Sequence, residues 1–154
     1  MRFAPIAAFF AALSFTAPAY ATPQLRNLLA AISATGTSIV VDHPQQCKDP
    51  KLLGRYSYQR NVVDQLLICV ANHRGDNAEL YDTILHESVH VAQACKGGPL
   101  YSSESIIKSA TPKDIQLVGT GYPNSQFNEE LEARVIAQGE DEVYVTNLIT
   151  QHCK

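Results

Sequence analysis

The stretch "LYDTILHESVHVAQACKGGP", residues 80–99, decides how this chain is interpreted. Its apolar residues recur at the three- and four-residue spacing of one buried helix face, as at Ile84 and Val91. Asp76 or Asn77, just upstream, can cap the N-terminus of this helix. The glycines and proline of "KGGP" end it. The stretch therefore predicts one long helix with both ends marked in the sequence.

The same helix carries a pattern of residues that suits a metal ion. His86 and His90 are four residues apart, so both imidazoles lie on one face, about 6 Å apart at Cβ. Glu87 projects about 100° around the helix from His86, beside the ion rather than bound to it. Zinc lowers the pKa of a bound water to about 7, so a carboxylate there suffices as general base. The alternative is two histidines on a solvated or packed face without a metal.

A catalytic zinc site needs a third protein ligand and keeps one position open. After His90 no histidine follows until His152, so the extended histidine motif that supplies a third imidazole is absent. A carboxylate on a later helix is the other solution. The segment "NEELEAR", residues 128–134, offers three glutamates.

A helical wheel separates these three glutamates. Glu130 falls on the same side as Phe127, where the helix packs, whereas Glu129 and Glu132 point the other way. A carboxylate on a packing face needs a partner, and a metal ion is a good one. Arg134, one turn further on, is the alternative partner. We expect Glu130 to be the third ligand, with one Zn²⁺ per chain.

Around the metal-binding helix the sequence predicts a small α+β domain. Helical periodicity, caps and breakers mark the helices, and short β-branched or aromatic runs mark the strands. Thr111 is expected to cap one helix, with Pro112 in its first turn, and Ser125 to cap the next. The expected helices are 23–34, the stretch 80–99 with its upstream cap, a short one after Thr111, 125–139 and one within 140–153; the expected strands are 37–43, 54–59 and 65–73, the last two antiparallel.

The first 21 residues have the features of a signal peptide. Arg2 precedes an apolar run, residues 6–15, and the segment closes on Ala19-Tyr20-Ala21, a small-x-small cleavage pattern. The alternative is a buried N-terminal helix or an anchor. The run is too short to span a bilayer, and no later segment approaches about 18 apolar residues. We expect a secreted or periplasmic single domain, residues 22–154. Whether 22–36 form a removable pro-segment is left open.

All four cysteines follow the predicted leader. An even number in an exported chain favours two disulfides, and four cysteines allow three pairings. Of these we expect Cys47 with Cys69 and Cys95 with Cys153. The formal charge of −3 includes no basic cluster, so nothing indicates nucleic-acid binding.

"TILHESVHVAQ" followed by "NEELEARVIA" resembles the gluzincin branch of the zincin metallopeptidases. The resemblance implies that His86, His90 and Glu130 bind zinc and that Glu87 is the general base. It also implies a small twisted sheet before the active-site helix and a glutamate helix packed beneath it.

The chain departs from the gluzincin pattern in one place. The acidic residue expected four positions after Glu130, which would orient His86, is replaced by Arg134. Either another group orients His86 or the site binds zinc less tightly. Gln93 lies on the same helix face as His86 and His90 and could reach them. For stabilising the oxyanion of the transition state the candidates are Tyr122, His152 and Tyr101. His43 and His73 are interpreted as surface residues.

The function predicted is a secreted zinc-dependent metallopeptidase that hydrolyses peptide or protein substrates. The alternative is a disulfide-stabilised secreted binding module whose zinc site is vestigial or structural. A zinc hydrolase that acts on other bonds is a third possibility. The substrate, its cleavage preference and the oligomeric state are left open by the sequence.

Overall fold

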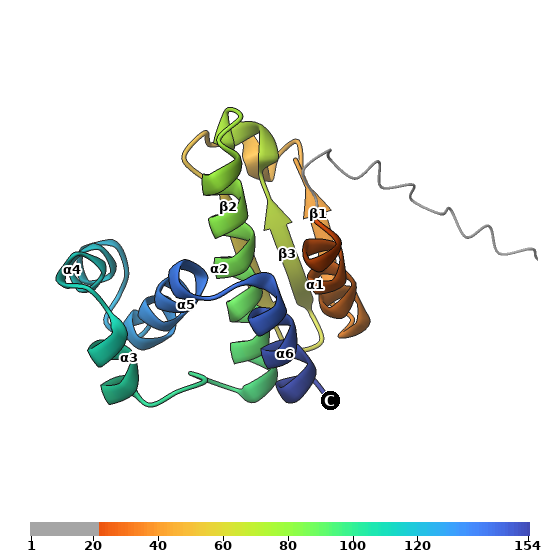
Figure 1. Ribbon diagram of the computed structural model, residues 1–154. Helices are drawn as coiled ribbons and strands as arrows, with labels where there is room; N and C mark the ends of the chain where they lie inside the picture. Colours follow the sequence, from red (N-terminus) through yellow and green to blue (C-terminus); the bar gives the residue numbers. More distant parts are fainter. Residues whose placement is uncertain (1–21) are drawn as a thin grey trace, which may run out of the picture.

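Three short strands form a mixed sheet in the computed structural model, which describes residues 22–154 (Figure 1). The strands are β1 (Ser38–Val41), β2 (Gly54–Gln59) and β3 (Val63–Ile68). Their order is β1-β3-β2, with β1 parallel and β2 antiparallel to β3. The central strand ends in a fully apolar, buried run, and β2 is left as an edge strand. The predicted signal peptide lies outside the described residues.

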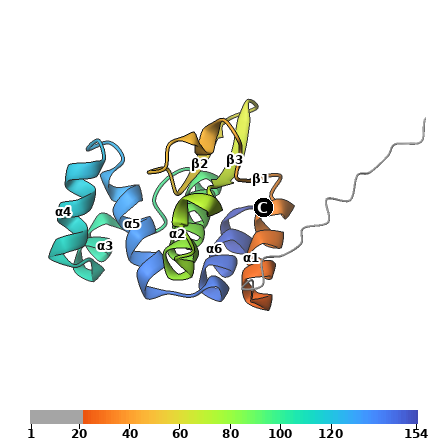
Figure 2. The ribbon, with the colours of Figure 1, turned by 90° about the horizontal axis from the view of Figure 1, so that it is seen from above.

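In residues 22–154 six helices lie in a row on one side of this sheet, and α3 and α4 extend beyond it (Figure 2). Helix α2 contacts β2, β3, α5 and α6, while α1 packs against α6 and β1. Helices α3 and α4 contact α5 and stand at the end of the row opposite α1. The α+β class predicted from the sequence is confirmed. The helices are α1 (Pro23–Ala34), α2 (Asn77–Lys96), α3 (Ser103–Ser109), α4 (Pro112–Gly121), α5 (Phe127–Gly139) and α6 (Glu142–His152), with 3₁₀ turns η1 (Gln46–Lys48) and η2 (Val70–His73).

Helix α2 begins and ends where its local sequence predicts. The Asp76 side chain accepts a hydrogen bond from the backbone N–H of Glu79, which caps the first turn. At the other end Gly97 adopts φ +84°, and its N–H bonds to the carbonyls of Gln93 and Ala94. Glycine reaches this left-handed conformation without steric cost. The helix is thus fixed at both ends by its own residues.

Both predicted disulfides are present. Cys47–Cys69 ties the loop after β1 to the end of β3, and Cys95–Cys153 ties the last turn of α2 to the end of α6. The second bridge spans 58 residues. In the chain-entropy account, closing a loop of that size stabilises the fold by about 4 kcal/mol. The first bridge therefore holds the loop between β1 and β2 against the end of β3, and the second holds the last turn of α2 against the end of α6.

Three local predictions are wrong. The strand expected over 65–73 ends at Ile68, and the chain then turns through η2. Its last residue, His73, is buried rather than on the surface, because its ring nitrogens bond to the carbonyl of Cys69 and the hydroxyl of Thr83, each at 3.0 Å. Ser125 is not a cap: α5 begins at Phe127 after Gln126.

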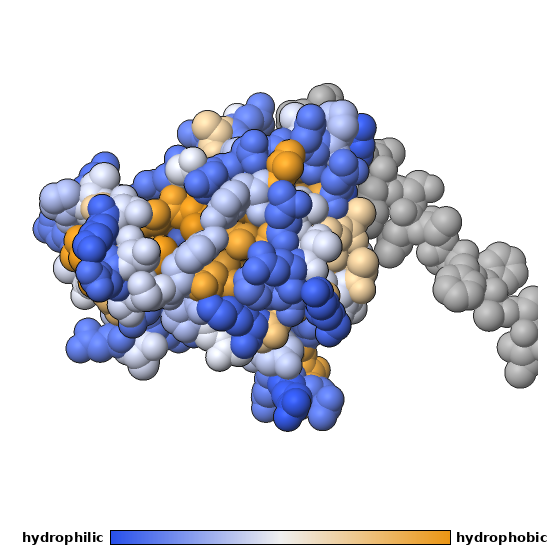
Figure 3. Space-filling model, turned by 60° about the horizontal axis from the view of Figure 1, so that its bottom comes forward, coloured by the Kyte–Doolittle hydropathy of each residue, from blue (hydrophilic) through white to orange (hydrophobic). Residues whose placement is uncertain are grey.

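Two groups of buried side chains fill the domain. The main core lies between the sheet and helices α1, α2, α5 and α6, and the small core lies between α3, α4 and α5. The small core consists of Ile106, Val118 and Leu131, with partly buried neighbours such as Phe127. Apolar residues also reach the surface between polar ones, as Figure 3 shows for the lower face. Within residues 22–154 no helix has the length and apolar character needed to cross a membrane.

Candidate metal centre

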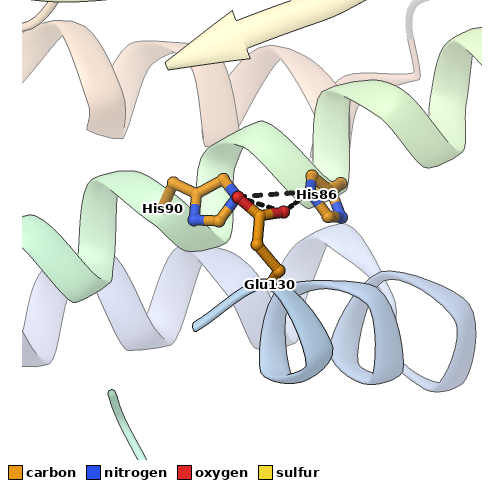
Figure 4. A group of neighbouring side chains, drawn as sticks. All are labelled: His86, His90 and Glu130. Carbon is orange, nitrogen blue, oxygen red and sulfur yellow. Dashed lines mark hydrogen bonds and ion pairs between the residues drawn. The ribbon is translucent and has the colours of Figure 1, made fainter. Parts of the chain in front are cut away.

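Three side chains from two helices converge at one point (Figure 4). His86 and His90 project from successive turns of α2, and Glu130 projects toward them from the first turn of α5. The two histidine Nε2 atoms are 3.2 Å apart. The Oε2 atom of Glu130 is 3.3 Å from Nε2 of His86 and 3.5 Å from Nε2 of His90. The structure thus brings together the three residues that the sequence suggested as ligands.

These distances fit the donor set of a zinc ion. Zinc binds histidine nitrogen and carboxylate oxygen at about 2.0–2.2 Å in a tetrahedron, so neighbouring ligand atoms lie roughly 3.3–3.5 Å apart. The separations in the structure have this size. In addition, Oε2 of Glu130 is buried and makes no hydrogen bond to any residue in 22–154. A buried carboxylate oxygen without a hydrogen-bond donor is costly, and a cation at this point would satisfy it.

The electrostatics of the cluster also favour a cation. Burial alone would raise the pKa of Glu130, but its contacts with His86 and His90 lower it to about 2. Burial alone would lower the pKa of His90, but the carboxylates of Glu130 and Glu87 outweigh this and raise it. Glu130 is therefore an anion at neutral pH, and a second carboxylate stands close to the cluster.

The alternative partner for Glu130 is engaged elsewhere. Arg134 donates from Nε to Oδ1 of Asp114 on α4 at 2.7 Å. It therefore pairs with the neighbouring helix. The sequence left two partners open for Glu130, a metal ion and Arg134. Within the described residues Arg134 forms no ion pair with Glu130.

The wheel prediction for the other glutamates of α5 is wrong in part. Glu132, expected on the outward side, is fully buried. Glu129 is half-buried and lines the same cleft as Glu130. The wheel assumed one packing face, but α5 packs against α2 on one side and against α3 and α4 on the other. An inner helix of this kind has little outward face to which a carboxylate can be assigned.

Gln93 orients one of the two histidines, as the sequence suggested it could. Its Oε1 lies 2.7 Å from Nδ1 of His90. It contacts His90, whereas the acidic residue of the gluzincin pattern at position 134 would orient His86. For Nδ1 of His86 no hydrogen bond is found in the described part of the chain. The two histidines are therefore held differently.

Glu87 is held by the edge strand. The backbone N–H of Tyr56 in β2 donates to Oε2 of Glu87 at 2.7 Å. This contact requires α2 to lie close to β2, and Gly54 permits it: a Cβ there would stand 2.7 Å from Cγ2 of Thr83 and 3.1 Å from Cγ of Glu87. No hydrogen bond to Oε1 of Glu87 is found among residues 22–154, so this oxygen has acceptor capacity left. Sequence reasoning missed this strand contact, for which the glycine opening "GRYSYQ" is the available signal.

An open cleft of about 640 Å³ lies over the cluster. Of the three residues considered for the oxyanion, Tyr122 lines this cleft, whereas Tyr101 and His152 do not. Tyr101 instead bonds through its hydroxyl to that of Tyr144. Burial, together with the charges of Glu130 and Glu87, raises the pKa of Tyr122. The cleft is lined by Leu52, Gly54, Arg55, Tyr56, Tyr58, His86, Glu87, His90, Gln93, Ala94, Gly97, Gly98, Tyr122, Gln126, Glu129 and Glu130.

The fold and the cluster together define a small α+β domain with a candidate His-His-Glu metal centre. The chain belongs to the family described as "Domain of unknown function (DUF8637)", which it matches over residues 19–154. No curated protein and no solved structure shows a significant match to it. The chemistry of the site therefore has to be argued from its own residues.

Proposed function

We propose that this chain is an exported zinc-dependent metallopeptidase. The observation that carries the proposal is the convergence of His86, His90 and Glu130 at zinc-like separations, with Glu87 beside them. A purely structural site has no need of a free carboxylate at that position. The resemblance of the two motifs to the gluzincins supports the same reading.

Each residue has a distinct part in the proposed reaction. His86, His90 and Glu130 would hold the ion. Zinc bound there would polarise the scissile carbonyl and lower the pKa of a water to about 7. Glu87, fixed through Oε2 by the N–H of Tyr56, takes the proton of the attacking water at Oε1 and returns it to the leaving amine.

Tyr122 is the proposed partner of the substrate oxygen. It lies at the cleft, and its phenol is protonated at neutral pH because the ordinary pKa of tyrosine, 10.0, is far above 7 and burial raises it further. A protonated hydroxyl can donate a hydrogen bond to the oxygen that becomes negative as the tetrahedral species forms. Tyr122 directly follows the last residue of α4, so this helix positions it at the cleft.

Export is supported by two independent features. The chain carries two disulfides and no free cysteine among the described residues. Disulfides persist in oxidising compartments such as the extracellular space or the periplasm. The signal-peptide features of residues 1–21 point to the same compartment.

The test is hydrolysis of casein or a peptide library by the purified protein and by the Glu87→Gln variant. The amide keeps the size of the side chain and can still accept from Tyr56, but it cannot take a proton from water. Hydrolysis should fall by a factor on the order of a hundred or more, while zinc content and melting temperature stay unchanged. Glu79→Gln, an exposed change on the same helix, is the matched control and should leave hydrolysis unchanged.

Two outcomes would contradict the peptidase mechanism. One is a Glu87→Gln variant that digests a confirmed substrate as fast as the parent. The other is a parent protein that binds zinc but cleaves nothing in a broad library, which would support the binding module with a structural zinc site.

A further inference from the structure

We propose that Glu132 is a positioning residue of the metal centre, acting on His90 through Gln93; the inference rests on the proposed zinc site. Glu132 is two positions after the ligand Glu130 on α5 and is fully buried. It does not reach the converging ligand atoms itself. Its contact with the site is the side chain of Gln93.

The amide of Gln93 can adopt only one orientation in this setting. Its Nε2 donates to Oε2 of Glu132 at 2.7 Å and to the backbone carbonyl of Glu129 at 3.0 Å. If the amide were flipped, its carbonyl oxygen would face these two acceptors and the contacts would become repulsive. The carboxylate and the carbonyl therefore direct Oε1 of Gln93 toward His90.

This orientation decides which nitrogen of His90 carries the proton. Because Oε1 of Gln93 can only accept, Nδ1 of His90 must be the donor in the 2.7 Å contact. In the neutral ring Nε2 is then unprotonated, and its lone pair faces His86 and Glu130. That is the protonation state a histidine needs to bind a metal through Nε2.

Glu132 is itself fixed by the chain that follows α2. Besides Gln93, it accepts hydrogen bonds from the backbone N–H groups of Leu100 and Tyr101, each at 2.7 Å. These three donors satisfy the buried carboxylate of Glu132, which forms no ion pair with any residue in 22–154. The carboxylate therefore has a defined position whether or not an ion is bound.

If the role of Glu132 were only to anchor the turn at Leu100 and Tyr101, its hydrogen bond to Gln93 would not be needed. The bond to Gln93 connects Glu132 to one histidine, whereas Nδ1 of His86 has no comparable acceptor in the described residues. The arrangement predicts that a substitution of Glu132 changes the ring orientation and protonation of His90 more than those of His86.

The first test reads the protonation of His90 directly. Nitrogen-15 NMR of the imidazoles in the full protein, after metal removal by a chelator and at a pH at which the ring of His90 is neutral, distinguishes the two neutral forms. We expect His90 to carry its proton on Nδ1. A His90 that carries its proton on Nε2 would overturn the inference, and this holds even if the protein proves to bind no zinc.

The second test is a double-mutant cycle of Gln93→Ala and Glu132→Gln, with zinc affinity measured by chelator competition. Gln93→Ala should weaken binding by about 10- to 100-fold. Glu132→Gln offers one acceptor oxygen to three donors and should weaken binding by about threefold or more. In the double variant the zinc losses should not add, because both act through one contact.

Three results would overturn the positioning role while leaving the zinc site intact. These are parent-like zinc affinity in Glu132→Gln, an unchanged affinity in Gln93→Ala, and zinc losses that add fully in the double variant. Glu140→Gln, an exposed change of the same charge at the end of α5, is the control and should bind zinc as the parent does. A parent that binds no zinc would instead refute the proposed function.

Discussion

The main core and the small core hold the cleft in different ways. Helix α2, which carries His86, Glu87 and His90, contacts the sheet, α5 and α6, and a disulfide closes its last turn. Helices α3 and α4 contact α5 and enclose few buried side chains. Residues that are to bind one ion together need fixed separations, and the three proposed metal ligands come from α2 and from α5, which packs against it. Tyr122, at the cleft edge, comes from the less anchored part.

Helix α5 is the boundary between these two regions. Its first turn supplies Glu130 to the cluster, Ala133 and Ile136 belong to the main core, and Leu131 belongs to the small core. A disturbance of the small core can therefore reach the metal cluster mainly through α5. This difference can be tested by weakening each core separately.

The largest effect is expected from Leu85→Ala, because Leu85 is fully buried in the main core. Removing such a side chain leaves a cavity and should cost about 3 kcal/mol or more in the free energy of unfolding. The matched change in the small core, Ile106→Ala, should cost about 2 kcal/mol, at the low end of the range. Denaturant titration measures both values.

Amide hydrogen exchange shows which region of the domain each substitution destabilises. In Ile106→Ala the amides of residues 103–121 should exchange faster while those of α2 keep their protection, because the two regions open separately. Leu85→Ala should accelerate exchange throughout the domain. Equal loss of protection in α2 for both variants would show that the two cores unfold as one unit.

Tyr122→Phe should have an intermediate effect, confined to activity. Loss of the hydroxyl removes one proposed donor to the oxyanion, and because 42 % of the residue is exposed, we expect kcat to fall by about tenfold. Zinc affinity and melting temperature should remain those of the parent. Tyr101→Phe, outside the cleft, is the control. Equal kcat in the parent and in Tyr122→Phe would remove Tyr122 from the mechanism.

The smallest effect is expected at the cap of α4. Hydrogen bonds from Thr111, and then the contact with Arg134, lower the pKa of Asp114 below its usual value of 3.8. A carboxyl whose folded pKa is depressed stabilises the fold above the unfolded value and loses this contribution as the pH falls through the folded one. Asp114→Asn should cost about 1 kcal/mol at pH 7. The difference from the parent should shrink below about pH 4, and a constant difference down to pH 2 would contradict it.

Local signals account for what the sequence predicted well. The cap at Asp76, the stop at Gly97 and the apolar spacing between them define α2 without reference to any other element. The short α3 escaped prediction because its seven residues include a single buried one, Ile106. Its two apolar residues, Ile106 and Ile107, are adjacent, and two neighbouring apolar positions define no helical period.

Contacts between distant segments account for what the sequence could not predict. Glu132 was assigned to the outside because a wheel contains no information on a helix packed from two sides. The bond from Tyr56 to Glu87 comes from a backbone N–H, a group that every residue except proline carries. Its only trace in the sequence is Gly54. His73 was misassigned because its partners, Cys69 and Thr83, come together only in the fold.

The central claim is that His86, His90 and Glu130 bind one zinc ion. Equilibrium dialysis followed by elemental analysis tests it most directly, on the parent, on the His86→Ala/His90→Ala double variant and on Glu130→Gln. We expect about one zinc per chain in the parent, none in the double variant, and weakened retention in Glu130→Gln, because a neutral amide is a poor zinc ligand. Near-stoichiometric zinc in the double variant, or a parent without zinc, would contradict the claim.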